Sequence, residues 1–161
     1  SMFSALFGGR PPNILVAEDN EVNQQVILGM LKNLGCDSDL ACDGSNAVKK
    51  AIAGRYDVIL MDMQMPELDG VTAMQNIRAL LAGKNCPPIV AMTAHALPGD
   101  RERYLSIGMD DYVAYHFLRG TALEMLNRSN EAVAEYLFVA TRAPTREQRD
   151  LAARHLEARD F

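Results

Sequence analysis

Acidic side chains end two of the apolar runs in this sequence, and a hydroxyl ends another. Glu18 and Asp19 close NILVAED, Asp62 closes DVILMD, and Thr93 closes IVAMT. An acid in such a place is most often a solvated turn residue or a helix cap, so each one alone is weak evidence. If the three carboxylates converge, they repel one another, and a divalent cation such as Mg²⁺ relieves that repulsion with oxygen ligands. A carboxylate beside such a cation can attack phosphorus and form an aspartyl phosphate, and a nearby hydroxyl can bond a phosphoryl oxygen.

Short apolar runs alternate with segments of helical spacing through the first two thirds of the chain. Strands are expected at NILVAED, CDSDLACD, DVILMD, PPIVAMTA and MDDYVAY, with a helix after each of the first four. Asn20 is expected to cap the first helix and Gly35 to end it. This alternation predicts an α/β fold with a parallel sheet, right-handed crossovers and helices on both faces. Ligands of such sheets bind beyond the carboxyl ends of the strands, which is where the acids stand.

Composition narrows the class of protein. The chain has 161 residues, 48% of them hydrophobic, and a formal net charge of −5, which argues against a nucleic-acid-binding surface. Its three cysteines lack metal-ligand spacing and indicate reduced thiols in a cytoplasmic protein. No apolar run reaches the length of a membrane span. Residues 1–12 are expected to be a loose leader that begins with a cleavage scar, Ser1-Met2.

Four blocks of the sequence resemble a known family. ILVAEDNEVNQQV, DVILMDMQMPELDG, IVAMTAHA and GMDDYVA stand where the receiver domain of two-component response regulators has its blocks, especially the receivers of hybrid histidine kinases. The resemblance covers about residues 13–114. It implies a flavodoxin-like fold whose five-stranded parallel sheet has the order 2-1-3-4-5.

The resemblance also assigns roles around the acids. It implies that Asp62 is the phosphoacceptor and that Asp19 and Asp62 bind Mg²⁺, together with the backbone carbonyl of Gln64. Glu18 would act on the metal through water. The phosphoryl donor would be a histidine kinase or a histidine phosphotransfer protein, so the domain is expected to be a signalling phosphoacceptor rather than a turnover enzyme.

The fifth block departs from the family. The resemblance implies Thr93 as the switch hydroxyl and Tyr112 as the aromatic that moves with it, but the family follows DDYVA with Lys-Pro, and this chain has Tyr115 and His116. A phenol lacks the charge of the lysine that reaches the phosphoryl group. Loss of that charge-assisted contact is expected to impair switching.

After residue 114 the sequence takes on the residue spacing of helices. HFLRGTALEMLNRS, EAVAEYLFVATRA and TREQRDLAARHLEARD predict three helices over 115–161, with part of the spacing of a tetratricopeptide (TPR) repeat. The alternative is that these helices pack on the sheet and replace the last helix of the receiver. Three interpretations stay open: a phosphoaccepting receiver, a degenerate receiver serving as an interaction module, and a chimera joined near residue 115. A homodimer or a domain-swapped assembly is expected if the helices leave an apolar sheet face uncovered.

Overall fold

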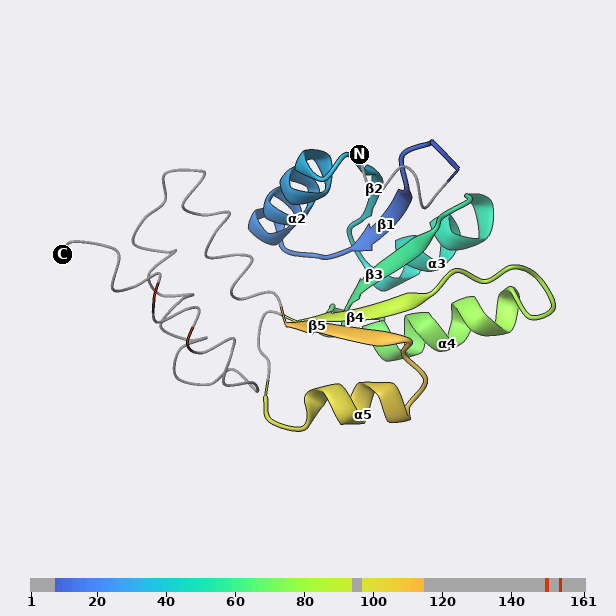
Figure 1. Ribbon diagram of the computed structural model, residues 1–161. Coiled ribbons are helices and arrows are strands. Elements are labelled where there is room, and N and C mark those ends of the chain that lie inside the picture. Colours follow the sequence, from blue (N-terminus) through green and yellow to red (C-terminus); the bar gives the residue numbers. More distant parts are fainter. Residues whose placement is uncertain (1–7, 94–96, 115–149, 151–153, 155–161) are drawn as a thin grey trace.

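The computed structural model describes residues 8–93, 97–114, 150 and 154 (Figure 1). Five parallel strands form one sheet in the order β2-β1-β3-β4-β5, which confirms the predicted fold class and strand order. The strands are β1 (Asn13–Ala17), β2 (Asp37–Ala41), β3 (Val58–Asp62), β4 (Ile89–Thr93) and β5 (Asp111–Ala114). The helices are α2 (Glu21–Asn33), α3 (Gly44–Ala53), α4 (Gly70–Leu80) and α5 (Asp100–Ser106). The predicted helical, TPR-like extension falls on 115–161 and, apart from residues 150 and 154, lies outside the described residues.

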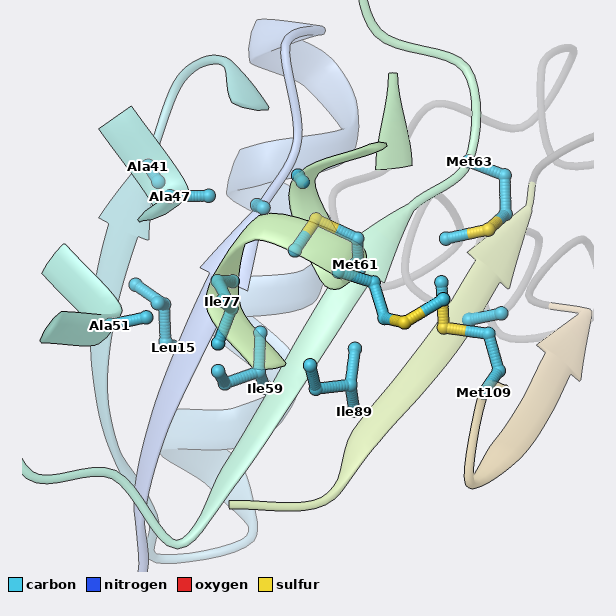
Figure 2. Packing of buried hydrophobic residues seen from close by; sticks show 14 of the residues in the cluster. Leu15, Ala41, Ala47, Ala51, Ile59, Met61, Met63, Ile77, Ile89 and Met109 are labelled. Carbon is cyan, nitrogen blue, oxygen red and sulfur yellow. The ribbon is translucent and has the colours of Figure 1, made fainter. Parts of the chain in front are cut away.

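Side chains that alternate along the central strands build a core on each face of the sheet. Leu15, Ile59 and Met61 point to the face covered by α3 and α4, while Val16 packs on the other face with Ile27 of α2. Figure 2 shows Met61, Met63 and Met109 inside the larger of these cores. Because helices cover both faces here, the central strands β1 and β3 are apolar over most of their length, as parallel strands usually are.

Local signals in the sequence account for the ends of the first helix. The Asn20 side chain accepts hydrogen bonds from the backbone N–H groups of Val22 and Asn23, so it caps α2 as predicted. Gly35 follows the end of α2 with a φ of 77°, a left-handed conformation that glycine adopts without strain. These two residues fix where the chain leaves β1 and where it turns back toward β2.

The first strand is shorter than predicted. β1 ends at Ala17, two residues before Asp19, where the sequence pattern placed its end. The backbone N–H of Glu18 still donates to the carbonyl of Ala41 at 3.0 Å, after which the chain turns into the cap of α2. Glu18 and Asp19 therefore lie just beyond the carboxyl end of a central strand.

The opposite edge of the sheet holds the segment before β1. The Arg10 guanidinium donates two hydrogen bonds to the Asp57 carboxylate, at 2.8 and 2.7 Å, and the backbone N–H of Asn13 donates to the same carboxylate at 2.8 Å. The Arg10 hydrogen bonds, followed by the Asn13 bond, hold the pKa of Asp57 at about 2. Arg10 belongs to the stretch expected to be a loose leader, and here it is tied to the start of β3.

β2 forms one edge of the sheet and is its most polar strand. Asp37 and Asp39 are exposed along it, and only Ala41 at its end is fully buried. The Asp39 carboxylate accepts a hydrogen bond from the Tyr56 hydroxyl at 2.8 Å. This strand, predicted to be weaker than the others, pairs with β1 along its whole length and adds only Leu40 and Ala41 to the two cores.

Candidate functional site

Three carboxylates meet at the carboxyl edge of the sheet. One carboxylate oxygen each from Glu18, Asp19 and Asp62 lies within 4.8 Å of the other two. Glu18 and Asp62 are buried and Asp19 is exposed. β1 and β3 are paired neighbours in the sheet, which is why residues 44 positions apart along the chain come together here. The sequence placed these acids at one edge, and the structure brings them into one cluster.

Burial and charge perturb Asp62. Removal of its carboxyl from water raises the pKa of Asp62 to about 7, and the charge of Glu18 and then that of Asp19 act in the same direction. The backbone N–H of Gln64 donates to Asp62 Oδ1 at 3.1 Å and opposes this rise. A carboxyl group held in this way favours either a proton or a cation beside it, and an all-oxygen donor set with one exposed member suits Mg²⁺.

The backbone of Glu18 is fixed by a residue that the sequence analysis missed. Gln24 donates from its side-chain amide to the carbonyl of Glu18 at 2.7 Å, and Gln24 is itself buried. The carboxylate of Glu18 accepts a further hydrogen bond from the backbone N–H of Asn20 at 3.0 Å. The signal for Gln24 was present, because it precedes Ile27 and Leu31 at helical spacing on the buried side of α2. A polar residue on such a stripe calls for a specific partner.

The loop after Asp62 is packed against the strand through a glycine. A Cβ atom added to Gly70 would lie under 3.0 Å from both the backbone carbonyl oxygen of Asp62 and the end of the Met63 side chain. Asp69 caps α4 by accepting from the N–H of Thr72 at 2.7 Å, so the helix starts at this contact. Any side chain larger than hydrogen at residue 70 therefore presses on the residue that carries the central carboxylate.

The remaining predicted site residues lie on the next strands. Thr93 ends β4 and is buried, one residue beyond Met92, the residue that pairs with Asp62. Tyr112 lies on β5, and its ring is buried against Tyr104 of α5. Burial, followed by the charge of Asp100, raises the pKa of Tyr112, so its phenol stays neutral. Tyr115, the departure at the lysine position, lies outside the described residues.

Fold and site together define a class: a doubly wound parallel α/β domain with a buried acidic cluster at its ligand-binding edge. The family model described as "Response regulator receiver domain" matches residues 14–127. The chain belongs to the response regulator receiver domain family. The match runs past residue 114, where the sequence analysis placed the end of the receiver.

Relatives and solved structures of several organisms are similar to this chain. Hybrid signal transduction histidine kinase G of Dictyostelium discoideum is 40% identical over 76% of this chain, and the matched part is 4% of that protein. Signal transduction histidine-protein kinase BarA of Escherichia coli is 37% identical over 63% of this chain and 11% of its own length. The chain thus spans a small part of the curated relatives that it matches.

Crystal structures of similar receiver domains include some with bound ligands. The receiver domain of sensor histidine kinase PA1611 from Pseudomonas aeruginosa, with a magnesium ion in its active site cleft, is 46% identical, with a TM-score of 0.59 over 73% of this chain and 96% of that one. The receiver domain of the histidine kinase CKI1 from Arabidopsis thaliana, complexed with Mg²⁺ and BeF₃⁻, is 26% identical, with a TM-score of 0.60 over 78% of this chain and 91% of that one.

Within the part of the chain that the structure describes, every helix is too short or too polar to cross a membrane.

Proposed function

We propose that this chain is a phosphorelay receiver that takes a phosphoryl group from a phosphohistidine onto Asp62. The convergence of Glu18, Asp19 and Asp62 on one sheet edge is the observation that carries this proposal. In the transfer, the P–N bond of the phosphohistidine breaks, its electron pair stays on the imidazole nitrogen, and a P–O bond forms with an Asp62 carboxylate oxygen. The donor is a histidine kinase or a histidine phosphotransfer protein, and the relatives named above support that partner class.

Mg²⁺ is the cofactor that the donor set fits. Asp19 and Asp62 would hold it with their carboxylates, Gln64 with its backbone carbonyl, and Glu18 through water. When bound, the ion supplies positive charge that offsets the phosphoryl oxygens. Asp62 attacks only as a carboxylate, and its raised pKa means that the metal-free protein keeps this carboxyl protonated to a higher pH than an ordinary aspartate. Asp19, the exposed member of the cluster, leaves one side of the site open to an incoming donor.

We propose that phosphorylation switches this domain poorly. Thr93 would report the phosphoryl group with its hydroxyl, and Tyr112 is the aromatic residue that the family couples to it, while Tyr115 stands where the family carries lysine. Without that cation, one charge-assisted hydrogen bond of roughly 1.5–3 kcal/mol is missing from the phosphorylated state. Phosphorylation would then proceed slowly and couple poorly to movement. A Tyr115→Lys variant should show larger amide shifts around Thr93 on addition of Mg²⁺ and beryllofluoride.

Acetyl phosphate with Mg²⁺ tests Asp62 as the acceptor without a protein donor. Intact-mass spectrometry of the whole chain should show one added phosphoryl group, and Asp62→Asn should abolish it. Asp69→Asn is the matched control, since Asp69 lies in the same loop outside the cluster and an asparagine can still cap α4. Equal incorporation in the Asp62→Asn protein excludes Asp62 as the acceptor.

A second function, that of an interaction module, is favoured by Tyr115 and by the helices predicted after it. In this alternative the chain is a degenerate receiver, or a chimera joined near residue 115, and its TPR-like segment over 115–161 binds another protein or a second copy of the chain. The family match to residue 127 instead supports a first helix, roughly Phe117–Leu126, that covers the sheet as the last helix of the receiver. Deleting the chain after Tyr115 separates the two: a well-folded product favours the module, and an insoluble or molten one favours the covering helix. A cytoplasmic location is part of the proposal in both cases.

A further inference from the structure

Two tyrosines form a buried stack beside the proposed site. Tyr104 of α5 and Tyr112 of β5 lie with their ring centroids 5.7 Å apart and their planes at 20°. Their exposed fractions are 8% and 9%, so neither ring is open to solvent. Tyr104 is the only aromatic residue in α5, whose other positions are largely polar. Tyr112 is the residue that the family resemblance expects to move, and Tyr104 has no predicted role.

The hydroxyl of Tyr112 does not help to keep its ring buried. Among the described residues, this oxygen is buried and has no hydrogen-bond partner. An unpaired buried hydroxyl opposes the buried position, because outside the core it would bond to water. The ring must therefore be held by its packing, and among the described residues its aromatic contact is the stack on Tyr104. A stacked pair shifts a two-position equilibrium by about 2- to 12-fold beyond the burial of area.

We propose that Tyr104 is a positioning residue that holds the Tyr112 ring inside the core, whatever the state of Asp62. The inference rests on the proposed function, since it concerns how a signal at Asp62 would leave the site. An outward swing of Tyr112 must break the stack and leave an apolar gap against Tyr104, which itself belongs to the larger core. The aromatic part of the switch is thereby fixed in one position.

A first experiment needs no ligand. The full chain with ¹³C-labelled tyrosine rings is compared with Tyr104→Leu, which keeps an apolar side chain without the stack, and with Tyr104→Phe, which keeps the ring. Tyr112→Phe assigns the signal. Access of a soluble paramagnetic agent to the Tyr112 ring should rise about 2- to 12-fold in Tyr104→Leu and stay unchanged in Tyr104→Phe. Equal access in all three proteins overturns the role of Tyr104.

The second experiment adds Mg²⁺ and beryllofluoride to the same proteins. The amide of Gln64, which donates to Asp62, reports whether the site binds the phosphoryl mimic. The Tyr112 ring signals should stay in place in the unaltered chain and in Tyr104→Phe, and should move with the Gln64 amide in Tyr104→Leu. A full response of Tyr112 in the unaltered chain refutes the inference. A silent Gln64 amide counts against the proposed function alone, because ring access without ligand still decides what Tyr104 does.

Discussion

Replacing Asp62 by asparagine should stabilise the metal-free fold while removing its proposed function. The folded protein holds the pKa of Asp62 at about 7 against an ordinary 3.8, because the carboxyl is buried beside Glu18. Between these two pH values the unfolded chain has lost the proton and the folded chain keeps it, so the free energy of unfolding falls as pH rises. Above pH ~7 Asp62 is ionised in the folded protein as well, and the loss of unfolding free energy is complete. A pKa difference of this size between the folded and unfolded states corresponds to about 4 kcal/mol.

The gain in unfolding free energy measured for Asp62→Asn should be smaller than this difference. The asparagine amide must still be desolvated, and water on the exposed side of Asp19 screens part of the charge, so we expect ~2 kcal/mol at pH ~8. At pH ~4.5 the same variant should gain well under half of this, because the folded wild-type protein is then protonated. Urea unfolding followed by circular dichroism, in the presence of a chelator, measures both values.

Addition of Mg²⁺ should reverse the order of stability. A ligand that binds only the folded state at a hundred times its Kd contributes about 2.7 kcal/mol, and the wild-type site should gain more of this than Asp62→Asn. Asp69→Asn serves as the control and should follow the wild-type protein in every condition. A gain in Asp62→Asn that is the same at both pH values, or no gain at all, would refute the assignment of a buried, strained charge to Asp62.

Three further changes follow from contacts in the fold. Gly70→Ala should lower the free energy of unfolding by about 1–3 kcal/mol in urea titrations, because the new methyl group presses on Asp62, whereas Gly29→Ala, with nothing within 4 Å of the new atom, should be neutral or stabilising. Asp57→Ala should cost roughly 1 kcal/mol by the same assay, and the difference should fade as pH falls from 3.8 toward 2, where the wild-type carboxylate takes up its proton. Below pH ~7 a proton competes with Mg²⁺ for Asp62, so each further unit of pH should lower the apparent Mg²⁺ affinity of the wild-type protein by up to about tenfold. Isothermal titration calorimetry measures this affinity, and a value that does not change with pH would contradict the prediction.

Local patterns were sufficient to predict the sheet and the acidic edge. Apolar runs, Asn20 as a cap and Gly35 as a stop are properties of neighbouring residues, and parallel alternation then places the acids at one edge of the sheet. That β3 lies next to β1, which brings Asp62 beside Glu18, came from the family resemblance rather than from the pattern. The end of β1 was predicted two residues too late, because hydrophobicity does not show that the Glu18 N–H is the last to pair with β2.

The contacts that tune the site were out of reach of the sequence alone. Arg10 and Asp57 are 47 positions apart, and only the fold shows that both lie at the amino edge of the sheet. Tyr104 and Tyr112 stack across a turn whose shape the pattern does not encode. The pKa of Asp62 depends on how much water the fold removes, which is a property of packing rather than of residue type.

The acidic edge strand β2 bears on how the protein behaves at high concentration. An edge strand offers unpaired backbone groups to any other extended chain, and strand addition from a second molecule is a common start of aggregation. Asp37 and Asp39 are exposed on this strand, so a second copy docking there in either direction brings carboxylates against carboxylates. The weak apolar pattern that made β2 the least recognisable strand is thus also a safeguard against self-association along this edge.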